Sequence, residues 1–354
     1  MGRRRLLLAI PPALLAAYLL LWPVPIDPIA WTPPPNPGFT GPYAPNDALA
    51  TAEVLPVGPA PEDVAVGPDG FAYTGLLDGR IVRLDANGTA TDVVNTGGRP
   101  LGMDFAPDGR LVVADAHRGL LRVDGVGVGG TPKIEVLATE ADGVPFRFTD
   151  DLAVAPDGAI YFTDASSKYE LGESVLGYLD HHGYGRLLVH TPDGKTRTLK
   201  GGLHFANGVA LAHDARSVLF NETFAHRVSR YWIDGPKRGQ FELVLDGLPG
   251  FPDNIDRGPD GTYWVALVKP RAAKAEFLAG HPFLRSVLMR LPKFMWPLPK
   301  RRGMVVQIDE KGAVVRTLQD PSGRVAIVTS ATLYRGHLYL GSFVEPHLAR
   351  LKWP

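Results

Sequence analysis

The sequence predicts an all-β fold, a six-bladed β-propeller with an N-terminal transmembrane helix. Three observations predict it. A short phrase containing a Pro-Asp-Gly turn recurs about every fifty residues, Gly (40) and Pro (33) are abundant among the 354 residues, and an apolar run follows three arginines near the amino terminus. Abundant Gly and Pro argue against a helical bundle and favour many short strands joined by turns.

The recurring phrase joins two alternating strands through a tight turn. Asp-Gly between alternating apolar runs is typical of a β-hairpin. A further strand pair follows most copies, so each repeat has four strands, as a propeller blade does. A β-sandwich, the alternative, gives no reason for a phrase to repeat in register. The copies are EDVAVGPDGFAYTG from Glu62, LGMDFAPDGRLVVAD from Leu101, DDLAVAPDGAIYFTD from Asp150, NGVALAHDARSVLFNE from Asn207, DNIDRGPDGTYWVAL from Asp253 and the degenerate SATLYRGHLYLGSF from Ser330.

The propeller is predicted to span residues 52–354. Its last repeat lacks an outer strand after Leu351, and the segment AEVLPV from Ala52 is expected to supply that strand and close the ring.

The segment before the propeller is predicted to be a signal anchor over residues 1–26 and a Pro-rich tether over 27–51. Three arginines precede an apolar run over 6–22, and no small-x-small cleavage site follows. An uncleaved single-pass anchor is therefore favoured over a cleaved signal peptide. Because arginines stay on the cytoplasmic side, the propeller is expected on the other side, in the periplasm, the lumen or outside the cell.

Composition excludes several function classes. The chain has 37 basic and 37 acidic residues, and this balance argues against nucleic-acid binding. It has no cysteine, which excludes disulfides, a thiol nucleophile, iron–sulfur clusters and cysteine-ligated zinc.

A polar residue recurs six positions before the turn proline, or its equivalent, in four repeats: Glu62, Asp150, Asn207 and Asp253. This position opens the innermost strand of each blade, so these side chains are expected to converge on the central channel. Three converging carboxylates repel one another unless a cation neutralises them. Carboxylate and amide oxygens suit Ca²⁺, although polar residues also open strands simply as caps. Asp115, Asp164 and Glu222 follow the second strands of three blades, where they either line the same face or cap turns, and turn capping is favoured.

Several longer phrases resemble the strictosidine synthase-like proteins, and among them the adipocyte plasma-membrane-associated group, which also has an amino-terminal anchor. The phrases are IYFTDASSKY from Ile160, LHFANGVAL from Leu203, RVSRYWIDGPKRG from Arg227 and LPGFPDNI from Leu248. The resemblance covers residues 55–354 and extends to the gluconolactonase and paraoxonase relatives. It implies a six-bladed propeller with a central Ca²⁺. The ligands that it implies are Glu62, Asp150, Asn207, Asp253 and the adjacent Asn254.

The chemistry that the resemblance implies is calcium-dependent hydrolysis of a lactone or aryl ester. Asp253 is then the base or nucleophile, and His204, three residues before Asn207, is a candidate helper or a loop residue that only packs. A strictosidine-synthase-type condensation needs an acid–base group, and the family's glutamate aligns with residues 329–333, where there is no carboxylate. The alternatives are a non-catalytic interaction propeller with structural calcium, which belongs to another class, and a strictosidine synthase-like condensing enzyme with an unrecognised base.

Residues 268–303 are predicted to be a basic, amphipathic insertion in blade 5. They contain nine basic residues and one acid, Glu276, with apolar residues at near-helical spacing. This pattern is typical of a membrane-surface element, here over 271–302, which could also cover the channel mouth. A packed side helix made soluble by its charges is the alternative.

Overall fold

The computed structural model describes residues 2–127, 130–296 and 300–353, and their side chains from residue 11 onward. Six four-stranded antiparallel sheets form the body of the molecule. The innermost strand of each sheet packs against the innermost strands of both neighbouring sheets, so that the six sheets close into a ring. The predicted six-bladed all-β propeller is therefore confirmed.

The first three blades follow one another along the chain. Blade 1 contains β2 (Val64–Val66), β3 (Ala72–Gly75), β4 (Arg80–Leu84) and β5 (Ala90–Asn95). Blade 2 contains β6 (Pro100–Phe105), β7 (Leu111–Asp115), β8 (Gly119–Asp124) and β9 (Lys133–Ala138). A hairpin of β10 (Glu140–Ala141) and β11 (Val144–Pro145) leads to blade 3, which contains β12 (Thr149–Val154), β13 (Ile160–Asp164), β14 (Gly185–His190) and β15 (Thr196–Leu203).

The other three blades complete the ring. Blade 4 contains β16 (Ala206–Leu211), β17 (Ser217–Glu222), β18 (Arg227–Trp232) and β19 (Phe241–Leu245). Blade 5 contains β20 (Gly250–Arg257), β21 (Thr262–Pro270), β22 (Gly303–Asp309) and β23 (Val314–Asp320). Blade 6 contains β24 (Val328–Tyr334), β25 (His337–Ser342), β26 (Leu348–Lys352) and, as its outer strand, β1 (Glu53–Leu55). The expected closure of the ring by the segment from Ala52 is confirmed.

The core lies between the blades, because each sheet is covered on both faces. In β21, Tyr263 and Val265 pack toward blade 4, whereas Trp264 and Ala266 pack toward blade 6. Successive side chains of a strand point to opposite faces, so a strand that is buried on both sides is apolar at nearly every position. The alternating phrases of the sequence therefore become strands between two apolar layers.

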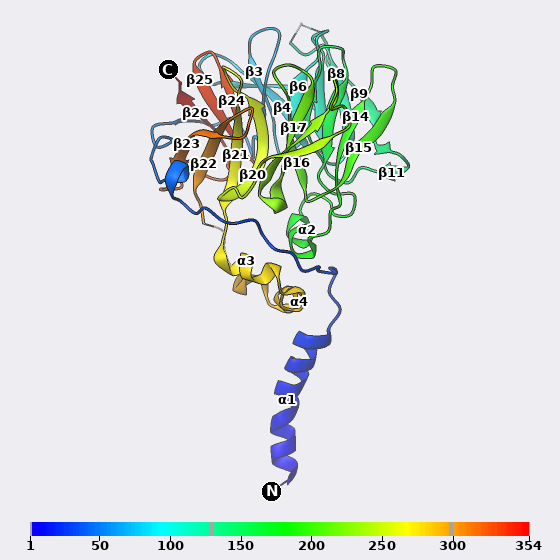
Figure 1. The fold of residues 1–354 in the computed structure, drawn as a ribbon, viewed down its shortest axis with the longest axis vertical. Helices are drawn as coiled ribbons and strands as arrows, with labels where there is room; N and C mark the ends of the chain where they lie inside the picture. The colour runs from blue at the N-terminus through cyan, green and yellow to red at the C-terminus, as the bar shows by residue number, and fades with distance from the viewer. Residues whose placement is uncertain (1, 128–129, 297–299, 354) are drawn as a thin grey trace.

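Helix α1 (Gly2–Leu21) forms where the anchor was predicted, and Figure 1 shows it projecting away from the propeller. Among the described residues, no helix combines the length and the apolar character that a membrane span requires. The predicted transmembrane span over 6–22 is therefore unsupported, and the side chains of residues 6–10 lie outside the described residues.

The Pro-rich tether is extended, apart from the short η1 (Gly41–Tyr43), but it is docked rather than free. Its Tyr43 and Leu49 side chains are buried against the propeller. The Asn46 side chain donates a hydrogen bond to the Thr317 backbone oxygen (3.1 Å), and Gln319 donates to the backbone oxygen of Tyr43 (3.1 Å). The tether therefore runs along one end of the propeller (Figure 1).

Helices at that same end lie close to the tether. They are α2 (Ser174–Asp180) in blade 3 and, in the blade 5 insertion, α3 (Ala273–Ala279), α4 (Pro282–Arg290) and η3 (Lys293–Met295). The buried Arg285 guanidinium donates to the backbone oxygens of Leu179, Ile29 and Ala279, and so joins α2, the tether and α3. Residues 297–299 of the predicted insertion lie outside the described residues.

Candidate active site

A repeated irregularity turns polar side chains into the channel. In blades 3, 4 and 5 the innermost strand shifts register against its neighbour, between Thr149 and Leu152, Ala206 and Val209, and Pro252 and Ile255. Such a bulge re-aims the residues within it. Those residues include Asp150, Asn207 and Asp253, which the repeat spacing had singled out.

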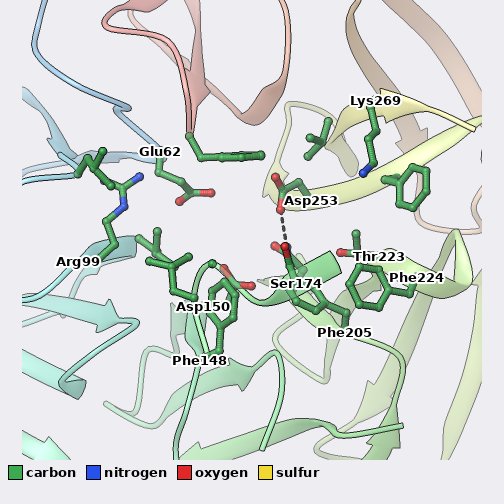
Figure 2. Close-up of a pocket in the computed structure, with 18 residues that line it drawn as sticks. Glu62, Arg99, Phe148, Asp150, Ser174, Phe205, Thr223, Phe224, Asp253 and Lys269 are labelled. Atoms are coloured by element: carbon green, nitrogen blue, oxygen red, sulfur yellow. Dashed lines mark hydrogen bonds between the residues drawn. The ribbon is translucent and has the colours of Figure 1, made fainter. Parts of the chain in front are cut away.

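The channel end that faces α2 holds a cavity of about 300 Å³. Glu62, Asp150, Asn207 and Asp253 line it, so four of the five predicted metal ligands meet there. Figure 2 shows the three carboxylates pointing toward one another across the cavity. The walls are largely apolar and aromatic, contributed by Leu77, Leu101, Phe148, Leu171, Phe205, Phe224, Phe251, Val268 and Phe343.

The fifth predicted ligand, Asn254, lies one residue deeper in the channel. It lines a second cavity toward the opposite mouth. Its amide nitrogen donates a hydrogen bond to Glu62 Oε1 (3.0 Å), which links it to the polar floor of the first cavity. The structure therefore brings Asn254 to the floor without exposing it to the first cavity.

Buried oxygens without partners mark this floor. Glu62 Oε2, Asp150 Oδ2, Asn207 Oδ1 and Asn254 Oδ1 accept no hydrogen bond from the described residues, although each side chain is at most 4% exposed. Buried polar atoms are normally paired, because burying one without a partner costs free energy. All four atoms are hard oxygen donors, so this floor fits a cation such as Ca²⁺.

The carboxylates alone do not form a metal cluster. No group of three or more Asp, Glu or His side chains in the described part of the chain is arranged to hold a metal ion. The amide oxygens of Asn207 and Asn254 lie at this floor beside the carboxylates. Asn207 already lies against the carboxylate, since its Nδ2 donates a hydrogen bond to Asp253 Oδ1.

The floor is electrostatically unfavourable for three charges. Burial, followed by the charges of Asp253, Asp63 and Asp150, holds the pKa of Glu62 well above its ordinary value. Burial, followed by the Asp253 charge, does the same to the pKa of Asp150. Burial raises the pKa of Asp253 to about 7, although the Asn207 hydrogen bond and Lys269 oppose the rise. The repulsion that the sequence predicted is therefore present in the cation-free protein.

Two cationic side chains that the spacing did not single out also line the cavity. Arg99 is buried beyond Glu62, where it donates to the Ala60 backbone oxygen (2.8 Å). Lys269 lies on the Asp253 side (Figure 2), with its Nζ 4.6 Å from the centre of the Phe251 ring. Lys269 had been counted with the basic insertion, but β21 continues to Pro270 and carries it into the cavity.

His204, the predicted catalytic helper, does not line the cavity. Its ring stacks on His181, with centroids 4.6 Å apart, and its backbone N–H donates to Glu222 Oε2 (3.1 Å). The next residue, Phe205, has a left-handed backbone (φ 62°), which breaks the alternation of the strand. The Phe205 ring therefore takes the place in the cavity wall.

Carboxylates at the ends of three second strands cap the loops that enter the inner strands, as expected. Asp115 accepts the backbone N–H of Arg99 (2.9 Å), and Asp164 accepts that of Phe148 (3.0 Å). Glu222 accepts the N–H of His204 and pairs with Arg227 (2.7 Å). These side chains hold the loops from which the cavity floor begins.

A second set of aspartates, two of them buried and Asp104 half-buried, links neighbouring inner strands. Asp63 accepts the backbone N–H of Met103 (3.1 Å), Asp104 that of Val154 (2.9 Å) and Asp151 that of Val209 (2.7 Å). Burial raises the pKa of Asp63 to about 7 and that of Asp104 to about 6. The sequence spacing, counted from the turn proline, did not single out this structural set.

In sequence, the chain is similar both to family models and to individual proteins. The family model of strictosidine synthase matches residues 150–236, and that of the strictosidine synthase-like N-terminal region matches residues 41–84. The chain is 38% identical over 313 residues to the Arabidopsis thaliana protein strictosidine synthase-like 6, covering 86% of this chain and 82% of that protein. It is 34% identical over 369 residues to the adipocyte plasma membrane-associated protein of Salmo salar, covering 96% and 86%.

Solved structures are similar in fold. A gluconolactonase from Xanthomonas campestris superposes with a TM-score of 0.62 at 18% identity, covering 87% of this chain and 91% of that one. A calcium-binding regucalcin from Agrobacterium tumefaciens gives 0.58 at 16% identity, covering 85% and 93%. At these identities the likeness shows the shared propeller fold alone.

Proposed function

The chain belongs to the strictosidine synthase-like family, and on that premise we propose that it is a calcium-dependent hydrolase of lactones or aryl esters. The observation that carries this proposal is the set of unpartnered oxygens at the floor of an otherwise aromatic cavity. Glu62, Asp150, Asn207 and Asp253 would hold the ion, with Asn254 behind them. The names of the gluconolactonase and of the calcium-binding regucalcin that share this fold agree with such chemistry.

The cavity residues have distinct tasks in this proposal. A bound Ca²⁺ supplies Lewis-acid polarisation of the substrate carbonyl. Phe148, Phe205 and Phe224 enclose the apolar part of the substrate and exclude water from it. Asp253, at the edge of the proposed ion site, accepts the proton of the attacking water. The Asn207 hydrogen bond fixes the orientation of that carboxylate.

The condensation after which the family is named needs an acid–base group. The inner strand of blade 6, β24, has no carboxylate to supply it. The side chains of Thr329 and Ser330 in β24 both donate to the Glu62 backbone oxygen (2.6 and 2.9 Å). They therefore fix the main chain at Glu62 and are not acid–base groups. A non-catalytic propeller with structural calcium remains the alternative, and it would have no need of an open aromatic cavity.

The test is an assay of phenyl acetate and a panel of small lactones with the full chain. We expect turnover that requires Ca²⁺, is lost with chelator and falls by at least a hundredfold in Asp253→Ala. Asp256→Asn is the matched control, because Asp256 also lies in β20, half-buried, but lines the opposite cavity. Absence of turnover, with Ca²⁺ still raising the melting temperature, would contradict a hydrolase and favour structural calcium.

We also propose that the protein lies against a membrane through α1 and the blade 5 insertion. Large apolar side chains are exposed along the insertion at Phe277, Phe283, Phe294 and Met295, and on α1 at Leu14, Leu15 and Leu20. Arg290 of α4 donates to the Trp22 and Leu19 backbone oxygens, so these two segments are joined. The adipocyte plasma membrane-associated relatives agree with this location.

Membrane binding by the insertion can be tested by replacing the exposed lysines around these apolar side chains. A chain without residues 1–21 keeps the propeller, the tether and the insertion. In that chain, Lys274→Gln with Lys293→Gln and Lys300→Gln should weaken binding to phosphatidylserine vesicles on the order of a hundredfold, at about 1 kcal/mol per lysine. Changing the exposed Lys195, Lys237 and Lys311 to Gln is the matched control. Equal binding of the two triple variants would contradict a membrane role for the insertion.

A further inference from the structure

Lys269 presents an ammonium group to the aromatic half of the cavity. The last residues of β21 carry it past the blade core, and its Nζ lies over the Phe251 ring at 4.6 Å from the centroid. The stem is held by the strand, whereas the ammonium faces the cavity on the Asp253 side (Figure 2). A lysine at this position is part of the wall that a ligand would touch.

The charge of Lys269 is not matched by a close partner. Within the described residues its ammonium makes no ion pair, and Asp253 is the charged group that acts on it. Burial lowers the pKa of Lys269, and the Asp253 carboxylate opposes that change. By contrast, Arg99 on the other side of the cavity is tied to the backbone oxygens of Ala60 and Gly75. Among the described residues, Lys269 is therefore the cavity cation that no hydrogen bond holds in place, whereas Arg99 is fixed to the main chain.

The balance of charge changes sign when a divalent cation binds. Three carboxylates (Glu62, Asp150 and Asp253) and two cations (Arg99 and Lys269) line the cavity, a formal charge of −1. A divalent cation would bring the formal charge to +1. It would also bind Asp253, the carboxylate on the Lys269 side of the cavity. An ammonium in a cavity with aromatic walls then attracts an anionic group of the ligand.

We propose that Lys269 forms an anion subsite, so that the cavity selects aromatic esters or lactones that carry a carboxylate. The carboxylate of the ligand would accept hydrogen bonds from Lys269 Nζ, and its ring would lie among the phenylalanines beside Phe251. This inference deepens the proposed function and rests on it for the reacting group. The binding of the acid group itself does not depend on turnover.

The test compares ligands that differ in one charge. Binding of 4-hydroxybenzoate and of its methyl ester to the full chain with Ca²⁺ is measured by calorimetry, and hydrolysis of 4-acetoxybenzoate and of its methyl ester is measured in parallel. The variants are Lys269→Met, Lys269→Arg and the matched control Lys200→Met, since Lys200 also lies over a phenylalanine ring (Phe241, 5.4 Å) but on outer strands.

We expect the wild type to bind the anionic ligand at least tenfold more tightly than the neutral one. Lys269→Met should abolish this preference, Lys269→Arg should restore most of it, and Lys200→Met should keep it. An unchanged preference in Lys269→Met would overturn the inference, because the anion would then bind the calcium ion or Arg99. Absence of binding by either ligand would also overturn it.

The outcomes separate the two proposals. Charge-selective binding that is lost in Lys269→Met, without hydrolysis of either ester, supports the anion subsite and contradicts the hydrolase. Calcium-dependent hydrolysis with no preference between the two esters supports the hydrolase and overturns the anion subsite.

Discussion

Replacing Asp253 by Asn should stabilise the cation-free protein, although it removes a proposed ligand of calcium. Burial raises the pKa of this carboxyl from 3.8 to about 7. The folded chain therefore holds the proton more tightly than the unfolded chain does. The stability that this group contributes is complete below about pH 4 and is lost as the pH rises to about 7.

The size of the effect follows from the two pKa values. Each tenfold change in proton affinity is worth about 1.36 kcal/mol, so the rise from 3.8 to about 7 corresponds to about 4 kcal/mol. Above pH 7 the wild-type carboxylate is ionised in a buried site and bears this cost, whereas asparagine stays neutral. Asparagine also keeps an oxygen that can accept the Asn207 hydrogen bond.

The assay is urea unfolding followed by tryptophan fluorescence at pH 5 and pH 8, in chelator and in Ca²⁺. In chelator at pH 8, Asp253→Asn should be more stable than the wild type by up to about 4 kcal/mol. In Ca²⁺ the order should reverse, because ligand binding stabilises the wild type and the variant has lost a donor. Asp256→Asn, where burial raises the Asp pKa to about 6, should gain about 3 kcal/mol in chelator without any reversal.

Two results would refute this reasoning. If Asp253→Asn is no more stable than the wild type in chelator at pH 8, the carboxylate is not destabilised by burial. If Ca²⁺ stabilises the wild type and the variant equally, Asp253 is not a ligand.

The other predictions concern calcium affinity and two structural contacts. Calcium affinity should rise from pH 6 to pH 8 with release of protons, because Asp253, Glu62 and Asp150 must ionise to bind the ion. Calorimetry in two buffers measures the affinity and the number of protons released, and a pH-independent affinity would contradict this expectation. Arg285→Ala should lower the free energy of unfolding by about 2–4 kcal/mol and speed chymotrypsin cleavage at Trp31, because backbone oxygens of the tether and two helices lose their hydrogen-bond donor. Cleavage at the wild-type rate would contradict this expectation. Leu55→Ala should lower the free energy of unfolding by about 2–5 kcal/mol, since this buried side chain closes blade 6; a urea midpoint equal to that of the wild type would exclude it.

The repeat phrase predicted the ring, its closure and most of the cavity floor because it fixes a register. A strand alternates with period two, so a position counted from the turn faces the same way in every blade. Glu62, Asp150, Asn207 and Asp253 were found in this way and line one cavity. Asn254 came from the family resemblance, and the bulge between Pro252 and Ile255, which contains both Asp253 and Asn254, is not visible in the spacing.

Other features depend on where strands end and on backbone irregularity. Lys269 was counted with the insertion because nothing in the sequence shows that β21 runs on to Pro270. His204 was placed near the channel by its distance from Asn207, but the left-handed Phe205 interrupts the alternation between them. Three of the nine basic residues of the insertion, Lys269, Arg271 and Arg285, serve buried contacts, so charge counting overstated its exposed charge.

The pairing of β1 with β26 imposes an order on folding. Glu53 and Arg350 form an ion pair (2.7 Å) across this seam although they are 297 residues apart. During synthesis the seam strand leaves the ribosome before any blade exists, and it must wait unpaired until the last blade arrives. Contacts this distant in sequence slow folding and leave a strand edge exposed meanwhile. Because the tether leads directly into β1 and docks on Thr317 and Gln319 of blade 5, it would hold that strand in place once blade 5 has formed, so the Pro-rich segment acts as a folding guide for the last blade as well as a link.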